Sequence, residues 1–177
     1  MDYFTFYGLE PVFHLDLNEL RKRYYQKSRE VHPDMNTPGQ TAGGEAVDDP
    51  MYWTALNNQA YQILQHPVTR LKYLIERYSG PIPEQQHKLS SEFLTSMMEF
   101  HEAFHEARMD PSSGKLEALK QQLADQEMQS WNDFDHILLA FDAGDRSPEI
   151  MDELTYLFFK QKYFKRLRET AEGGEEL

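Results

Sequence analysis

The chain has 177 residues, of which 40% are hydrophobic and 13% aromatic, enough to build one ordinary domain or two small ones. Its net charge of −12 argues against a general nucleic-acid-binding protein, because neutralising phosphates requires clustered Lys and Arg. The absence of cysteine excludes disulfides, thiolate metal sites and cysteine nucleophiles. Since no apolar run approaches the ~20 residues of a membrane helix, and the N-terminus has no targeting signal, we expect a soluble, cytoplasmic protein.

Acidic charge is concentrated in the second half of the chain. Residues 1–78 carry 8 basic and 10 acidic side chains, whereas residues 79–160 carry 6 and 16. The segment Ser-Gly-Pro-Ile-Pro at 79–83 separates these regions, and helices do not readily cross such a sequence. We therefore predict two domains, at 1–78 and 90–177, joined by a linker at 79–89.

Helical periodicity dominates the first domain. Asp16 and Glu19 have the spacing of a capping box, and an amphipathic helix follows until Pro33 ends it. A second helix begins at Asp49-Pro50, after a loop rich in Gly and Pro, and a short helix follows His66-Pro67. These elements predict a helical hairpin with short flanking helices.

Three long helices are predicted in the second domain. The first begins at Ser90-Ser91, the second extends from Ser112 or Ser113 to Gly144, and the third begins at Ser147-Pro148. Amphipathic helices with short connections are typical of an antiparallel three-helix bundle. Because no segment has the alternation of a β-strand, the predicted fold class is all-α.

The tripeptide His32-Pro33-Asp34 stands where the first hairpin helix ends. Taken alone, it is explained as a helix stop followed by a solvated turn. The preceding helix, however, ends in a basic face, which together with a rigid exposed corner is suited to electrostatic docking of an acidic protein partner. A solvated charged face remains an alternative for the individual bases. The helix carries five of the eight bases of the first domain: Arg21, Lys22, Arg23, Lys27 and Arg29.

The order of these motifs resembles a J-domain. Asp2-Tyr3-Phe4 and Gly8-Leu9 precede the basic helix and His32-Pro33-Asp34, and Gln59-Ala60-Tyr61 follows in the next helix. The resemblance implies docking on a DnaK-type chaperone ATPase and stimulation of its ATP hydrolysis. It also implies that the chaperone-binding residues are His32, Pro33, Asp34, Lys22, Lys27 and Arg29.

A narrower resemblance is to the HscB family of J-type co-chaperones in iron–sulfur cluster assembly. It rests on the segment Leu-Asn-Asn-Gln-Ala-Tyr at 56–61, on His66-Pro67 and Tyr73-Leu74, and on the acidic helical second half. It implies that the C-terminal bundle binds an IscU-type scaffold protein and presents it to a DnaK/HscA-type chaperone, with no cofactor and no nucleic-acid or membrane partner. The chain resembles the bacterial form, without a cysteine-rich N-terminal extension, and we expect a monomer or a weak dimer.

The helix from Ser91 carries a second apolar row beside its core-facing stripe. Leu94 and Met98 lie one turn apart, flanked by carboxylates. The row either widens the packed face or forms an exposed protein-binding strip. The family resemblance implies a scaffold-binding site made of Leu94, Met98, Glu99, Glu102 and Tyr163. Thr95 and Tyr163 are more polar than the family pattern, which leaves the affinity open.

The segment His-Glu-Ala-Phe-His at 101–105 matches the zincin signature, in which two imidazoles bind zinc and the glutamate acts as general base. Such a site needs a third ligand, and no motif marks the nearest candidates, Asp125 and Glu127. We therefore expect an adaptor with no metal site rather than an enzyme. A zinc metallohydrolase, and a J-domain protein with another client, are the alternatives.

Overall fold

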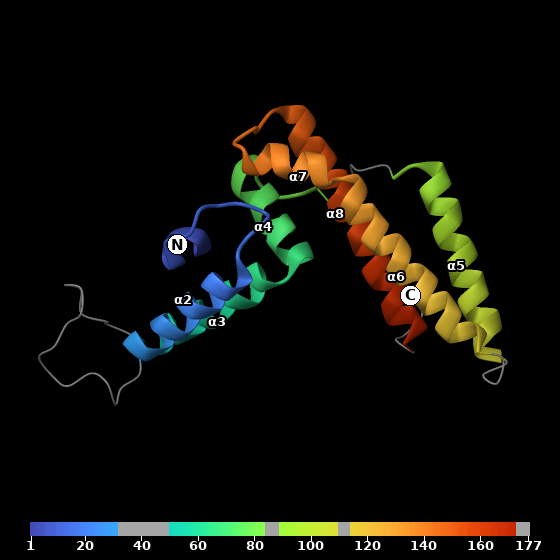
Figure 1. Cartoon of the computed structure of the whole chain (residues 1–177), viewed down its shortest axis with the longest axis horizontal. Helices are drawn as coiled ribbons and strands as arrows, with labels where there is room; N and C mark the ends of the chain where they lie inside the picture. The colour runs from blue at the N-terminus through green and yellow to red at the C-terminus, as the bar shows by residue number, and fades with distance from the viewer. Residues whose placement is uncertain (32–49, 84–88, 110–113, 173–177) are drawn as a thin grey trace, which may run out of the picture. The chain divides into compact units, whose positions relative to one another are not determined.

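The computed structural model describes residues 1–31, 50–83, 89–109 and 114–172. Within these ranges the regular structure is entirely helical (Figure 1), so the predicted all-α fold class is confirmed. None of the described helices combines the length and the hydropathy needed to cross a bilayer. The helices are α1 (Tyr3–Tyr7), α2 (Leu17–Val31), α3 (Pro50–Gln65), α4 (Pro67–Ser79), α5 (Ser91–Met109), α6 (Lys115–Asp133), α7 (Asp135–Asp142) and α8 (Pro148–Ala171).

The chain divides into two compact units, Met1–Leu74 and Ile75–Leu177. The division falls inside α4, because the last residues of that helix pack within the second unit. There the rings of Tyr78 and Phe141 meet edge to face, with centroids 5.6 Å apart. The domain limits drawn from composition, at residues 78 and 90, remain predictions.

In the first unit, α2 and α3 lie side by side as a helical hairpin (Figure 1). Their buried faces contribute Leu20, Leu56, Ala60 and Leu64, at the spacing expected of amphipathic helices. The chain turn at His66 separates α3 from α4, as the His-Pro sequence predicts.

The short helix α1 is tied to α4 by aromatic and polar contacts. The ring of Tyr3 stacks on that of Tyr73, with centroids 4.7 Å apart. The Tyr73 hydroxyl donates to Asp2 Oδ2 (2.8 Å) and accepts from the Tyr3 backbone N–H (2.9 Å). Asp2 also caps α1, because its Oδ1 accepts from the Thr5 backbone N–H.

The predicted capping box at the start of α2 forms only in part. Asp16 Oδ1 accepts from the backbone N–H groups of Asn18 (2.8 Å) and Glu19 (3.2 Å), which confirms the helix start. The Glu19 carboxylate lies on Arg23, with 2.7 Å between Nε and Oε1. The Glu19 carboxylate therefore pairs with a side chain one turn further along the helix instead of reaching back to the helix start.

In the second unit, α5, α6 and α8 run alongside one another (Figure 1) and enclose an apolar core. The core stripe predicted for the helix from Ser91 is confirmed by the burial of Met97, Phe100, Phe104 and Ala107. These side chains meet α6 and α8 in one cluster, and Phe93 packs against it half-buried. Its buried members are Met97, Phe100, Phe104, Leu123, Phe164, Leu167 and Ala171.

The prediction of one continuous helix up to Gly144 is wrong, because the helix breaks at Phe134. Phe134 has φ −99° and ψ 2°, and its N–H donates to the Trp131 carbonyl three residues back (3.2 Å), a tighter turn than that of an α-helix. Its ring stacks on Tyr156 of α8, with centroids 6.0 Å apart. The break starts α7 afresh, with Leu138 and Phe141 buried.

The start of α6 also differs from the prediction. The residue that precedes the helix is Gly114, at φ 68° and ψ 0°, rather than Ser112 or Ser113, which lie outside the described residues. Glycine adopts this left-handed backbone conformation readily because it has no Cβ. The helix therefore begins at a glycine with a left-handed backbone and has no side-chain cap. The preference of serine for helix starts does not predict this.

Candidate functional site

The bases predicted to bind a chaperone lie along α2. Lys22 and Arg29 are exposed and Lys27 is half-buried. The Nζ atom of Lys22 lies 3.6 Å from the Glu19 carboxylate, and that of Lys27 lies 3.0 Å from Glu30. Surface ion pairs of this kind contribute little to stability, so they leave the basic side chains available to a partner.

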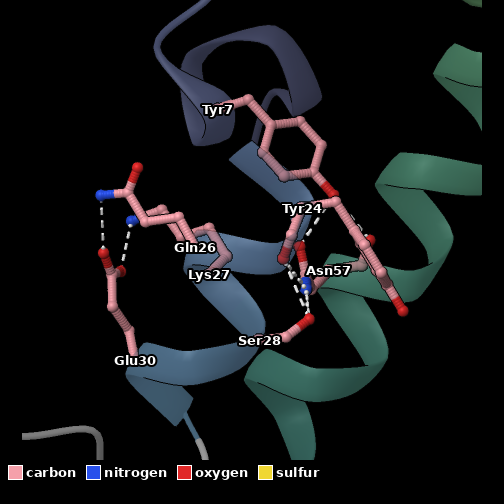
Figure 2. A network of polar contacts seen from close by, with 7 residues as sticks. All are labelled: Tyr7, Tyr24, Gln26, Lys27, Ser28, Glu30 and Asn57. Carbon is pink, nitrogen blue, oxygen red and sulfur yellow. Dashed lines mark hydrogen bonds and ion pairs between the residues drawn. The ribbon is translucent and has the colours of Figure 1, made fainter. Parts of the chain in front are cut away.

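Two glutamates moderate the charge of this helix face. The hydrogen bond from Arg23, assisted by the positive charge of Lys22, holds the pKa of Glu19 below its ordinary value. Glu30 accepts hydrogen bonds from Gln26 Nε2 (3.1 Å) and Lys27 Nζ (3.0 Å), as Figure 2 shows. The surface of α2 therefore carries charges of both signs, and the exposed bases Lys22 and Arg29 lie between Glu19 and Glu30 along the helix.

The predicted corner His32-Pro33-Asp34 follows α2 directly, because the helix ends at Val31. The three residues lie outside the described part of the chain. What the structure describes is the helix that leads into them. The direction in which α2 ends is set by its packing on α3, and this packing rests on a polar network.

A buried polar network joins α1, α2 and α3 (Figure 2). Its centre is Asn57 of α3, which is 2% exposed. The Tyr7 hydroxyl donates to Asn57 Oδ1 and to the Asn57 backbone carbonyl, both at 2.8 Å. Asn57 Nδ2 in turn donates to Ser28 Oγ (2.9 Å) and to the Tyr24 backbone carbonyl (3.2 Å). The oxygen of this one side-chain amide thus binds α1 and its nitrogen binds α2, and both contacts help to fix the register of the hairpin.

Tyr7 is held in its protonated form within this network. Burial, with smaller contributions from the nearby Tyr24 and Tyr61 hydroxyls, raises its pKa above the ordinary value for tyrosine. The hydroxyl is therefore a donor at any physiological pH. Periodicity missed this network, although it contains a signal: Asn57 stands at a helical spacing from the buried Ala60 and Leu64, where an apolar residue is expected.

The residues predicted to bind a scaffold lie mostly on one face of α5. Leu94, Met98 and Glu102 follow one another at four-residue intervals, so they lie on successive turns. Leu94 is half-buried, Met98 is 64% exposed, and Glu99 and Glu102 are exposed. Met98 therefore projects from the packed face instead of widening it. We call the surface formed by Leu94, Met98, Glu99 and Glu102 the α5 strip.

Tyr163 of α8 is brought to the helix that carries the α5 strip. Its ring packs half-buried against the bundle core and meets the ring of Phe93 edge to face, with centroids 6.1 Å apart. The Arg166 guanidinium also lies over the Tyr163 ring, with its Cζ atom 4.9 Å from the ring centroid. Because Phe93 immediately precedes Leu94, the aromatic pair joins Tyr163 to the first turns of α5.

The zincin-like segment 101–105 lies within α5. His101 and His105 are exposed on α5. The two carboxylates considered as third ligands have other partners: Asp125 accepts from Gln121 (2.9 Å) and Glu127 binds Arg168 (2.7 Å). Over the described ranges, no group of three His, Cys, Asp or Glu side chains is placed to hold a metal ion.

Comparison with known proteins gives a family match for the second unit. Residues 89–172 match the family described as the HSCB C-terminal oligomerisation domain. The match covers α5 to α8 and so includes the α5 strip and Tyr163.

Solved structures share the fold over the whole chain. The human co-chaperone protein HscB is 24% identical, with a TM-score of 0.76 over 97% of this chain and 81% of that one. The chaperone HscB from Vibrio cholerae is 21% identical, with a TM-score of 0.64 over 97% and 96%. The Jac1 co-chaperone from Saccharomyces cerevisiae is 20% identical, with a TM-score of 0.58 over 100% and 97%. The predicted resemblance is therefore confirmed in the C-terminal domain and in the overall fold.

The hairpin network generates a stability prediction. Replacing Asn57 with Ala removes the side-chain bonds to Tyr7, Ser28 and the Tyr24 carbonyl, while the Tyr7 hydroxyl keeps the backbone carbonyl of residue 57. Because each net hydrogen bond contributes about 0.5–1.5 kcal/mol, their combined loss should cost about 1–3 kcal/mol. In a Trp131→Phe background, which leaves Trp53 as the only tryptophan, we expect urea denaturation followed by fluorescence to show a loss of that order. Gln62→Ala, on an exposed position of the same helix, is the control and should change the free energy of unfolding by less than about 0.5 kcal/mol. Equal stability of the two variants would contradict the role given to Asn57.

Proposed function

We propose that this chain, whose residues 89–172 match the HSCB C-terminal domain and whose fold is that of solved HscB structures, is a J-type co-chaperone of iron–sulfur cluster assembly. In this role it binds an IscU-type scaffold protein and delivers it to a DnaK/HscA-type chaperone ATPase. One observation carries the proposal: a basic helix that ends directly before His32-Pro33-Asp34 stands in the same chain as an HSCB C-terminal domain. Neither feature alone specifies both partners.

The first docking surface is electrostatic. Lys22 and Arg29 expose their charges on α2, and Lys27 is oriented by its contact with the Phe6 ring, 5.6 Å from Nζ to the centroid. Such a surface attracts an acidic partner over several ångströms and orients it before contact. We propose that the chaperone is bound here, with His32, Pro33 and Asp34 contacting it at the end of the helix.

The second docking surface combines apolar and acidic groups. Met98 is exposed, Leu94 is partly so, and the carboxylates of Glu99 and Glu102 border them. Apolar contact areas with a polar rim are typical of protein interfaces. We propose that the scaffold is bound by the α5 strip together with Tyr163, whose ring adds an amphipathic edge to the apolar contact.

In this mechanism the chain is an adaptor, and no bond is made or broken on it. Hydrolysis of ATP takes place on the chaperone. The chain supplies proximity: holding a scaffold near the chaperone raises its effective concentration there without any new contact between the two. Docking of the His-Pro-Asp corner then favours the state of the ATPase that hydrolyses ATP. The size of this effect is set by how much more tightly the corner binds that state than the resting state.

The chaperone site is tested by a single substitution. We expect the full chain to raise the steady-state ATP hydrolysis of a DnaK/HscA-type chaperone, and His32→Gln to lose nearly all of that increase. The substitution removes the imidazole contact and leaves the described packing of α2 unchanged. Gln62→Ala should stimulate as the unchanged chain does. Full stimulation by the His32→Gln variant would contradict the assignment.

The scaffold site is tested by a double substitution. Leu94→Ala with Met98→Ala removes apolar contact area worth a few kcal/mol, so we expect affinity for an IscU-type scaffold to fall by at least about tenfold. Met128→Ala is the matched control, because Met128 of α6 is also 64% exposed but lies outside the α5 strip. Binding is measured by calorimetry or pull-down.

Two outcomes separate this proposal from its alternatives. If the double variant binds the scaffold as well as the Met128→Ala control does, the α5 strip is not the binding site. If the unchanged chain stimulates the chaperone but does not bind the scaffold, the client is a different protein.

A further inference from the structure

The exposed row on α5 continues beyond Met98 into two histidines. The row has sequence intervals of four, three and four, which is the spacing of one helix face. Its members are Leu94, Met98, His101 and His105. Both histidines are exposed. The proposed function uses the first two members of this row and gives no role to the last two.

We propose that His101 and His105 form a noncatalytic binding site for a divalent transition-metal ion such as Zn²⁺. Residues four apart on a helix have Cβ atoms about 5–6 Å apart, so both imidazoles reach one ion between them. Imidazole is a preferred ligand of Zn²⁺, Ni²⁺ and Cu²⁺. This proposal replaces the expectation, drawn from the sequence, that the chain has no metal site.

The packing of α5 holds the two histidines in register. Each of them directly follows a buried phenylalanine: Phe100 is 5% exposed and Phe104 is 1% exposed. The two phenylalanine rings lie 6.1 Å apart in the bundle core. Because these anchors fix the rotation of the helix, the backbones beneath His101 and His105 keep their spacing whether or not a metal is bound. A preorganised pair loses less entropy on binding than two mobile ligands do.

Local charge also favours a cation. Each histidine is followed by an exposed glutamate, Glu102 and Glu106, and Glu99 lies less than one turn before His101. Three carboxylates stand against one base, Arg108, in this stretch of the helix. The site lies in the half of the chain that carries most of the negative charge, so cations are concentrated near it.

The coordination sphere is open. Because no third His, Cys, Asp or Glu completes a site in the part of the chain that the structure describes, the remaining positions are left to water or to a group of another molecule. A site of two ligands binds weakly and exchanges its metal readily. It also lacks the three-ligand geometry that catalytic zinc sites have, so we assign it binding and no hydrolysis.

The site is tested on the untagged full chain alone, by calorimetric titration with zinc chloride at near-neutral pH. We expect one Zn²⁺ per chain. Removing either imidazole takes away an intramolecular ligand with an effective concentration in the millimolar range, so His101→Ala and His105→Ala should each weaken binding by at least about tenfold. His136→Ala is the control, since His136 of α7 is exposed and has no histidine one turn away.

Nuclear magnetic resonance of the imidazole groups locates the ion independently. The ring signals of His101 and His105 should shift together, ahead of those of the other five histidines. Unchanged affinity in both alanine variants, or no binding at millimolar zinc, would overturn the proposal, as would one ion shared between two chains. Because neither chaperone nor scaffold is present, this result stands or falls separately from the proposed function.

Discussion

The side-chain amide of Asn57 is the interaction on which the first unit depends. Its carbonyl oxygen accepts from Tyr7 of α1, and its nitrogen donates to Ser28 and to the Tyr24 carbonyl of α2. In a low-dielectric interior an unpaired polar group is costly, so the amide favours the arrangement of the three helices in which all of these bonds form. The direction of the last turn of α2, which ends at Val31, follows from this arrangement.

The second unit is packed largely through aromatic side chains. Phe93 contacts Tyr163 and Phe164, while Phe134 stacks on Tyr156. Lys160 of α8 lies between these groups, 5.3 Å from the centroid of Phe93 and 5.4 Å from that of Phe134. Cation–aromatic contacts add to the apolar burial. The same aromatic residues that close the core thus bring Tyr163 of α8 to α5.

Much of this architecture is predictable from the sequence, and the exceptions have physical reasons. Proline and glycine mark the ends of helices through steric limits that act within a few residues, so the breaks at His66-Pro67 and Ser147-Pro148 were predicted. The break at Phe134 was not, because no proline or glycine marks it. The flanking Asn132, Asp133 and Asp135 are only weak helix formers, and the ring of Phe134 stacks on Tyr156 of another helix. Asn57 was missed for a related reason: its partners lie 29 to 50 residues away in sequence.

The candidate site shows the same limit. Periodicity placed Leu94 and Met98 on one row but could not decide whether that row packs inward, since burial depends on where the neighbouring helices lie. The structure separates the two, with Leu94 half-buried and Met98 exposed. For Tyr163 the sequence supplied only a family resemblance, because a contact between α5 and α8 joins residues far apart in the chain.

The central claim is that one chain must carry both docking surfaces. Its most direct test mixes two variants, His32→Gln and the double variant Leu94→Ala/Met98→Ala, and measures the scaffold-dependent part of the chaperone's ATP hydrolysis. Each variant retains one surface, and physical linkage between the surfaces is lost in the mixture. The account predicts that the mixture gives no scaffold-dependent increase beyond that of either variant alone. Restoration of the increase given by the unchanged chain would contradict it.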